Sequence, residues 1–182
     1  KEIDNSSVSN FLYLGYIPGE STIYTSCKKL KPGHYAVVDA NGLQINPYWQ
    51  IEDKLKPDTV KDELVAKAQL DKLVQTSVAY CMISDVPLGI FLSGGVDSSL
   101  VAAVAQQQSA TSVKTFSIAF EDKKFNEAPF ARQVARHIGS QHHEFTVTEK
   151  EALLLTDSLL DVYDEPYADS SAIPTMMVSK LA

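Results

Sequence analysis

The sequence predicts an α/β protein built on a doubly wound parallel sheet, with a β-hairpin appended at its N-terminal end. Three observations support this prediction. From residue 86 onward, short apolar runs alternate with helical patterns, an order typical of a parallel sheet covered by helices. Nearer the N-terminus, Asn41-Gly42 separates two extended runs, as in a hairpin. The composition, with 45% hydrophobic and 21% charged residues, is that of a globular protein.

The N-terminal third is expected to hold the hairpin and a linker. We predict strands over 34–39 and 43–49, joined by a tight turn that tolerates positive φ angles. A lone hairpin buries too little surface to be stable, so this one must pack on another part of the molecule. After a polar segment, Thr59 is expected to cap a helix over 60–82, whose apolar residues recur every three or four positions.

The remaining elements are predicted from the alternating pattern. Asn126 is placed at a helix start and Gly139 at a left-handed helix end, while Thr148 is expected to cap a helix that runs to about residue 162. The predicted elements, in order, are a strand over 88–92, a helix over 98–107, a strand over 113–120, a helix over 126–139, a strand over 143–147 and a helix over 148–162.

Charge and cysteine content exclude several function classes. Sixteen Lys and Arg against twenty-three Asp and Glu give a net charge of −7, which argues against nucleic acid or an anionic membrane as the main partner. No apolar run approaches the roughly 20 residues that span a bilayer. The N-terminal residues do not form a signal-peptide pattern. The two cysteines have no metal-binding spacing, so a reduced cytoplasmic setting is expected. Cys27 and Cys81 are interpreted as inert thiols.

The segment with the clearest chemical signal is Leu92-Ser93-Gly94-Gly95-Val96-Asp97-Ser98-Ser99, at the junction of a predicted strand and helix. Ligands of doubly wound sheets bind at such strand ends. Two glycines allow the backbone to approach an anion closely, and the helix N–H groups with three serine hydroxyls form an anion cradle. The carboxylate of Asp97 would repel a phosphate, so we expect it to hold a Mg²⁺ ion between them.

A plain turn with an acidic helix start is the alternative interpretation, and the length of the motif makes it the weaker one. The segment is neither a P-loop, because no lysine follows, nor a dinucleotide-binding loop. SGGVDSS instead resembles the signature of the N-type ATP pyrophosphatases, the PP-loop family with the adenine nucleotide alpha hydrolase-like fold. Members of that family cleave ATP to AMP and pyrophosphate while they adenylate a substrate.

The flanking segments resemble one branch of this family, the glutamine-hydrolysing asparagine synthetases. Residues 11–18, 29–35 and 48–49 resemble the end of their class II glutaminase domain, and residues 85–95, 126–128, 142–144 and 164–166 resemble the start of their synthetase domain. The resemblance covers essentially the whole chain. It implies a glutaminase tail and linker over 1–57 and the N-terminal part of the ATP-pyrophosphatase domain over 58–182.

The resemblance also implies a reaction, its ligands and the residues that bind them. ATP and Mg²⁺ are required, and a carboxylate is adenylated and then amidated by ammonia from glutamine, giving asparagine, AMP and glutamate when aspartate is the acceptor. Ser170 stands where well-known bacterial members carry arginine, so another carboxylate stays open as the acceptor. Asp97 is the expected metal ligand, and no residue of this chain is assigned as catalytic. The expected ATP-binding residues are Leu92, Ser93, Gly94, Gly95, Asp97, Ser98, Ser99 and Ile118.

Alternative functions remain open at this point. The chain could be another PP-loop ligase, such as a GMP or NAD synthetase, or a non-catalytic nucleotide-binding domain. The family's N-terminal cysteine nucleophile and its second phosphate-contacting motif are not found in the sequence, so we expect a fragment that is inactive alone. A homo-oligomer is compatible with the sequence.

Other polar residues carry weaker signals. His142 and His143 are adjacent on a predicted strand, so they point to opposite faces and cannot share a ligand. His137 is given no catalytic role. Asp164 and Glu165 are candidates for holding substrate or metal, with surface charge as the simpler interpretation.

Overall fold

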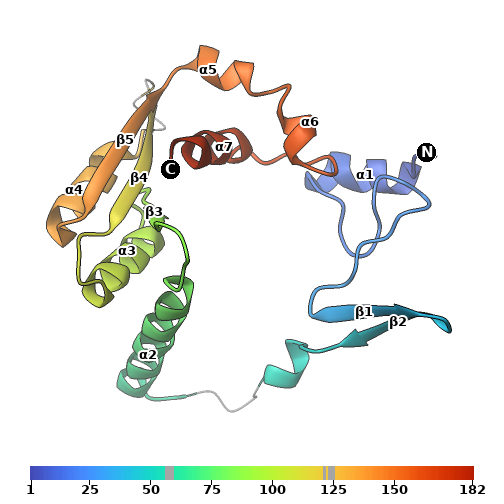
Figure 1. Ribbon diagram of the computed structural model, residues 1–182, viewed down its shortest axis with the longest axis horizontal. Coiled ribbons are helices and arrows are strands. Elements are labelled where there is room, and N and C mark those ends of the chain that lie inside the picture. The colour runs from blue at the N-terminus through green and yellow to red at the C-terminus, as the bar shows by residue number, and fades with distance from the viewer. Residues whose placement is uncertain (56–59, 121, 123–125) are drawn as a thin grey trace. The chain divides into compact units, whose positions relative to one another are not determined.

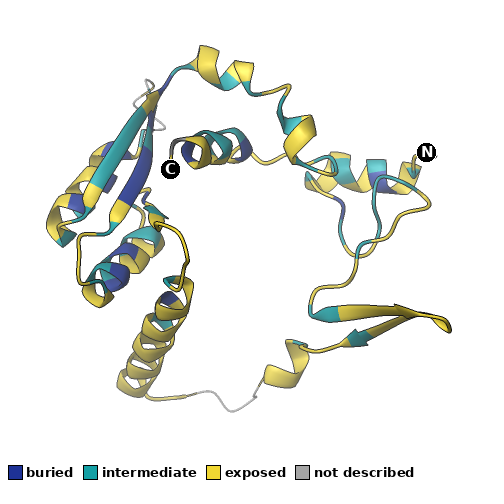
Figure 2. Cartoon of the chain, viewed as in Figure 1, coloured by how far each residue is buried: buried dark blue, intermediate teal, exposed yellow. Residues whose placement is uncertain are grey.

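The computed structural model describes residues 1–55, 60–120, 122 and 126–182. The chain divides into two compact units, one made of Lys1–Thr59 with Asp157–Ser170 and one made of Val60–Thr156 with Ser171–Ala182. Figure 1 shows the helices and strands of each unit. Figure 2 shows that the buried residues gather mainly in the sheet and helices of the second unit.

The first unit begins with helix α1, Asn5–Leu14 (Figure 1). Asp4 caps this helix, because its carboxylate accepts from the Ser6 N–H (3.0 Å) and the Ser7 hydroxyl (2.8 Å). The helix ends at Gly15, whose φ of 80° is the left-handed conformation that glycine adopts without steric cost.

The predicted hairpin is confirmed. Strand β1, His34–Asp39, pairs antiparallel with β2, Gly42–Pro47, and the register places Asp39 opposite Gly42. The turn residues are therefore Ala40 and Asn41, and the positive φ of 113° falls on Gly42, the first residue of β2. A short 3₁₀ helix, η1 (Glu52–Lys54), follows.

Residues 157–170 complete this first unit, although they lie far along the chain. They include helix α6, Leu159–Val162. The Ala168 N–H donates to the Gly15 carbonyl (2.8 Å), and Lys29 Nζ pairs with Glu165 Oε1 at 2.7 Å. Lys29 Nζ also donates to the Ile17 carbonyl (2.6 Å). These contacts fasten the late segment to the N-terminal one.

The second unit is an α/β structure, as predicted. Its elements in chain order are α2 Glu63–Cys81, β3 Gly89–Phe91, α3 Val96–Gln108, β4 Lys114–Phe120, α4 Ala128–Ile138, β5 Gln141–Val147, α5 Glu149–Leu154 and α7 Ala172–Leu181. The three strands are parallel and lie in the order β3-β4-β5. Helix α4 ends at Gly139 with φ 73°, which confirms the predicted left-handed cap.

Predicted helix limits differ from the structure at several points. Helix α3 begins at Val96 and not at residue 98, and the cap residue of α4 is Glu127 and not Asn126. The cap predicted at Thr59 lies outside the described residues, and α2 begins at Glu63 because the Asp62 carboxylate accepts from the N–H groups of Leu64 and Val65. The single helix predicted over 148–162 is wrong, because α5 ends at Leu154. Residues 155–158 form turns, and they include Thr156, Asp157 and Ser158, whose side chains compete for backbone hydrogen bonds.

Small side chains position the helices against the sheet. Because successive parallel strands are joined by right-handed connections, α3 and α4 lie on the same face. Their shared core contains Leu92 of the loop after β3, Ala102 of α3, and Ala131 and Ala135 of α4. Alanines at these contacts let both helices come close to the strand ends, which holds the loop over residues 92–95 between them.

Candidate functional site

The glycine-serine loop occupies the predicted position between a strand end and a helix start. Leu92 is 2% exposed, and its N–H donates to the Phe116 carbonyl on β4 (2.8 Å). Gly95 is the N-terminal cap residue of α3. The first helical hydrogen bond runs from the Ser99 N–H to the Gly95 carbonyl (3.0 Å), so the N–H groups of residues 96–98 precede it and are available to an anion.

Gly94 is required for two independent reasons. Its φ is +85°, a left-handed conformation that disfavours side chains. A Cβ at this position would lie 2.5 Å from the Ala131 backbone nitrogen and 2.6 Å from Phe130 Cβ, both on α4. The loop therefore rests directly on the first turn of α4, and only glycine leaves room for this contact.

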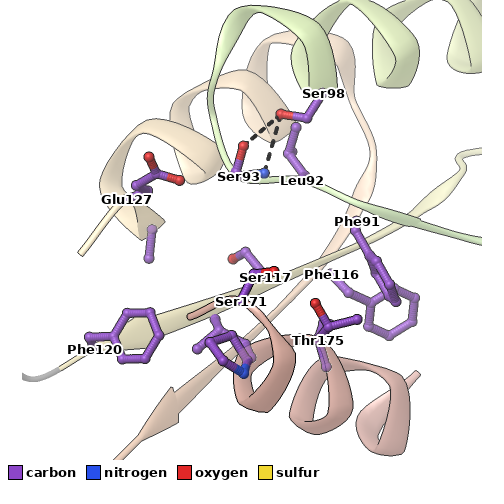
Figure 3. Close-up of a pocket in the computed structure, with 14 residues that line it drawn as sticks. Phe91, Leu92, Ser93, Ser98, Phe116, Ser117, Phe120, Glu127, Ser171 and Thr175 are labelled. Carbon is purple, nitrogen blue, oxygen red and sulfur yellow. Dashed lines mark hydrogen bonds between the residues drawn. The ribbon is translucent and has the colours of Figure 1, made fainter. Parts of the chain in front are cut away.

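Hydrogen bonds among the loop residues hold its hydroxyl groups in place (Figure 3). Ser98 Oγ accepts from the Ser93 N–H (3.3 Å) and lies 2.9 Å from Ser93 Oγ. Ser98 Oγ also donates to the Gly95 carbonyl (3.2 Å), and the Gly95 N–H donates to Ser93 Oγ (3.3 Å). The loop is thus organised by its own side chains before any ligand binds.

A cavity of about 410 Å³ lies beside this loop in the second unit. It is lined by the loop, by β4, by the first residues of α4 and by α7 (Figure 3). Of the predicted nucleotide-binding residues, four line the cavity, namely Leu92, Ser93, Ser98 and Ile118.

The other predicted residues do not line the cavity. Gly94 and Gly95 shape the loop, as described above. Asp97 is exposed in the first turn of α3. The Ser99 hydroxyl is buried and has no hydrogen-bond partner in the described part of the chain.

Four polar residues of the cavity wall were missed by the sequence analysis: Ser117, Glu127, Ser171 and Thr175. Ser171 immediately precedes α7 and Thr175 lies four residues later, a spacing that places both on one side of the helix. Ser117 directly precedes the predicted Ile118. These spacings are visible in the sequence, but they indicate a cavity only once α7 is known to pack against β4.

The charged groups near the sheet are held in a structural pair. Arg132 of α4 donates two hydrogen bonds from Nη2 (2.6 and 2.9 Å) and one from Nε (3.1 Å) to the Glu144 carboxylate on β5. This pairing raises the pKa of Arg132 above its usual value. Glu144 lies within β5.

The two adjacent histidines face opposite sides of the sheet, as predicted. The His142 ring contacts the hydroxyls of Thr115 and Ser117, whereas the His143 ring stacks on Phe116 with centroids 5.1 Å apart. Burial lowers the pKa of His142 below its usual value of 6.5.

Asp164 and Glu165, considered for substrate or metal, belong to the first unit, where Glu165 pairs with Lys29. Both cysteines are exposed free thiols.

The fit of Mg²⁺ can be judged from the available donors. No group of three or more His, Cys, Asp or Glu residues in the described ranges could by itself hold a metal ion. Magnesium, however, keeps several waters and binds one or two carboxylates together with phosphate oxygens. The exposed Asp97 carboxylate at the loop fits that mode of binding, in which the nucleotide supplies the remaining oxygens.

Among the described helices, none has the length and hydropathy needed to cross a bilayer.

The parallel sheet and the SGGVDSS loop at the end of its strand β3 define an α/β protein of the PP-loop class. Within this class the chain belongs to the asparagine synthase family, whose sequence model matches residues 69–182. This match confirms the resemblance found in the sequence.

Similar proteins include the putative asparagine synthetase (glutamine-hydrolyzing) 2 of Methanocaldococcus jannaschii, 36% identical, and asparagine synthetase (glutamine-hydrolyzing) 1 of Bacillus subtilis, 31% identical, each aligned with 100% of this chain. Asparagine synthetase B (glutamine-hydrolyzing) of Escherichia coli is 32% identical over 83% of this chain. The chain covers 35%, 28% and 30% of the lengths of these three relatives. The predicted domain boundary after residue 57 stays a prediction.

Proposed function

We propose that this chain supplies the first part of an ATP site at which a carboxylate is adenylated and then amidated, with aspartate as the expected acceptor. The observation that carries the proposal is the loop over residues 92–99, in which Gly94 brings the backbone against α4 and the N-terminus of α3 opens beside the cavity. Membership of the asparagine synthase family supports the assignment of this loop to ATP.

In the proposed complex the phosphates of ATP lie on the loop and the adenine lies beside Leu92 and Ile118. The N–H groups of residues 96–98 donate hydrogen bonds to phosphate oxygens. The hydroxyls of Ser93 and Ser98 can donate to phosphate only when they give up the hydrogen bonds that they make to each other and to the Gly95 carbonyl. Leu92 and Ile118 contribute apolar surface of the cavity to the base. Positive potential at the N-terminus of α3 favours the bound anion further.

The proposed chemistry consists of two displacements. A carboxylate oxygen attacks the α-phosphorus, and the bond from that phosphorus to the bridging oxygen breaks, so that pyrophosphate leaves. Ammonia then attacks the acyl carbon, AMP leaves, and the nitrogen loses a proton to give the amide. Mg²⁺ held by Asp97 would neutralise charge on the phosphate oxygens. The loop donors contribute by orienting the phosphates and by stabilising the charge that develops on them.

Glutamine is the proposed source of the ammonia. The relatives described above carry the words glutamine-hydrolyzing in their names, and the tail over residues 1–57 resembles the end of a glutaminase domain. Aspartate is the proposed acceptor by the same relationship, and another carboxylate is the alternative.

Calorimetry with ATP tests the nucleotide and metal roles on this chain. We expect the wild type to bind ATP more tightly with Mg²⁺ than without it, and Asp97→Asn to lose this difference while its circular dichroism spectrum stays unchanged. Asp71→Asn, at an exposed carboxylate on α2, is the matched control and should behave as the wild type. Equal magnesium dependence in Asp97→Asn and wild type would remove the metal role.

The overall reaction is tested on the natural full-length gene product. Pyrophosphate release and amide formation are measured with glutamine and a set of carboxylates that includes aspartate. We expect release that requires both glutamine and aspartate. ATP binding without pyrophosphate release from any carboxylate would favour a non-catalytic nucleotide-binding domain instead.

A further inference from the structure

A chain of hydrogen bonds runs under the cavity from α4 to β4 and includes His142. Thr115 Oγ1 lies 2.9 Å from Ser140 Oγ and 2.9 Å from His142 Nδ1. On the other side of the ring, His142 Nε2 lies 3.2 Å from Ser117 Oγ. Thr115 is 0% exposed, so its hydroxyl cannot exchange these partners for bulk water, and Ser117 is only 5% exposed. Each group must therefore satisfy its neighbour in the chain.

The donor and the acceptor of each hydrogen bond in this series can be assigned by starting from Ser140. Ser140 Oγ donates its one proton to the Ala135 carbonyl (3.4 Å), so toward Thr115 it can only accept. Thr115 therefore donates to Ser140 and accepts from His142, which requires the proton on Nδ1. In the neutral ring Nε2 then carries a lone pair and accepts the hydroxyl proton of Ser117.

This direction matters because Ser117 also belongs to the cavity wall. Figure 3 shows Ser117 between the Ser93–Ser98 loop and the residues of α7. With its single proton donated to His142, the Ser117 oxygen has only lone pairs left for other partners. It can accept a hydrogen bond from a ligand but cannot donate one.

We propose that His142 is a positioning residue that holds the Ser117 hydroxyl as a hydrogen-bond acceptor for a donor group on the nucleoside part of the ligand. This inference rests on the proposed function, because it takes the ligand of the cavity to be a nucleotide. The relevant donor of an adenine nucleoside is its exocyclic amine, because a ribose hydroxyl can accept as well as donate and would not depend on the direction of the Ser117 hydroxyl. A purine with a carbonyl in place of the amine would lose an interaction made by the amine.

Protonation of His142 would invert the role of Ser117. An imidazolium donates from both nitrogens, so Nε2 would donate to Ser117 Oγ and the Ser117 proton would turn away from the ring. The charged groups that face His142 are Glu144 on β5, which raises its pKa, and Arg132 on α4 and His143 on β5, which lower it. Burial is the largest influence, and it lowers the pKa of His142 and so favours the neutral ring.

Nitrogen NMR of the histidine side chains tests the assigned donors and acceptors of these hydrogen bonds without any ligand. At pH 7.5 we expect His142 as a neutral ring with its proton on Nδ1. Ser117→Ala should shift the Nε2 resonance and Thr115→Val should change the tautomer ratio. His34, whose Nδ1 lies 2.9 Å from the Pro32 carbonyl in the first unit, provides a reference that neither substitution should move. A proton on Nε2, or the tautomer mixture of a free histidine, would overturn the inference.

Adenosine binding tests the consequence for the ligand, because adenosine has no phosphate that titrates near neutral pH. Ser117→Ala should weaken adenosine binding about three- to tenfold at pH 7.5, the loss expected for one hydrogen bond. Acidification through the His142 pKa should weaken binding by the wild type and not by Ser117→Ala. His142→Gln, whose amide both donates and accepts, should retain binding and lose the pH dependence, whereas His142→Phe should lose binding as Ser117→Ala does.

The two proposals fail in different ways. If the wild type binds neither ATP nor adenosine, the proposed function falls, and the proposed role of Ser117 toward the ligand falls with it. If ATP and adenosine bind and neither Ser117→Ala nor pH alters adenosine affinity, the proposed function stands and the role of His142 is refuted.

Discussion

Gly94→Ala should destabilise the second unit and should do so by more than left-handed strain alone. Moving an alanine into the left-handed region costs about 1–2 kcal/mol, and the φ of Gly94 is +85°. The added Cβ would also lie 2.5 Å from the Ala131 nitrogen and 2.6 Å from Phe130 Cβ. Both atoms are fixed by the α4 backbone and cannot rotate away, as is the Phe130 carbonyl carbon at 2.7 Å, so a further cost of about 1–3 kcal/mol is expected for overpacking. The total is about 2–5 kcal/mol.

Gly139→Ala is the matched control for this prediction. Gly139 has a φ of +73°, and a Cβ there would meet no atom within 4 Å. The free energy of unfolding of Gly139→Ala should therefore fall by only about 1–2 kcal/mol, which is the backbone-strain part of the loss expected for Gly94→Ala. Both variants gain the same small benefit from a less flexible unfolded chain, so this term cancels in the comparison.

Urea unfolding followed by circular dichroism measures both losses. The difference between the two variants isolates the close approach of the loop to α4. Equal losses would refute the conclusion that the loop is pressed against the first turn of α4. In the Gly94 variant the loop can relieve the clash only by lifting from α4, so ATP affinity should fall together with stability.

Three further predictions concern the same unit. Ser99→Ala should leave the free energy of unfolding unchanged or raise it, because the buried Ser99 hydroxyl has no hydrogen-bond partner within the described residues. Ser98→Ala should lower it by about 1 kcal/mol, because the Ser98 hydroxyl makes hydrogen bonds within the loop, and urea titration compares the two variants. Arg132→Ala should cost less than about 1 kcal/mol, in a salt-dependent way, and should raise the pKa of His142 in an NMR titration, because the Arg132 charge lowers that pKa. The pKa of His142 is lower in the folded state than in the unfolded state, so its contribution to stability should be present above pH 6.5 and lost as the pH falls from 6.5 through the folded-state pKa. His142→Gln should reduce this loss, as measured by urea titrations at several pH values.

The fold class was predictable because each strand and helix of the second unit carries its own local signal. The apolar run before Ser93 and the alanine-rich segment after it allow few other structures. Element limits were less predictable, because they depend on which polar side chain captures a free N–H group. Asp62 caps α2, and nothing in the local pattern distinguishes it from Thr59 as a cap.

The division of residues 148–162 between two units shows a different limit of the sequence. Periodicity indicates that a segment can be helical, but it does not say which core the segment joins. Residues up to Thr156 belong to the second unit, and residues from Asp157 to Ser170 join the first through Lys29 and Gly15. Those partners lie more than a hundred residues away in the chain, so only the folded structure identifies them.

The candidate site combines both kinds of information. The loop over residues 92–99 is local, so its glycines and serines were identified from the sequence. The opposite wall comes from Ser117 on β4 and from Ser171 and Thr175 at α7, which ordinary strand and helix patterns do not mark. The loop hydroxyls bond to one another and to the Gly95 carbonyl, which holds the loop in shape, and we propose that the N–H groups of residues 96–98 are its donors to phosphates. In the proposed site, discrimination among ligands then falls to the opposite wall, where Ser117 Oγ lies 3.2 Å from Nε2 of His142 on the neighbouring strand.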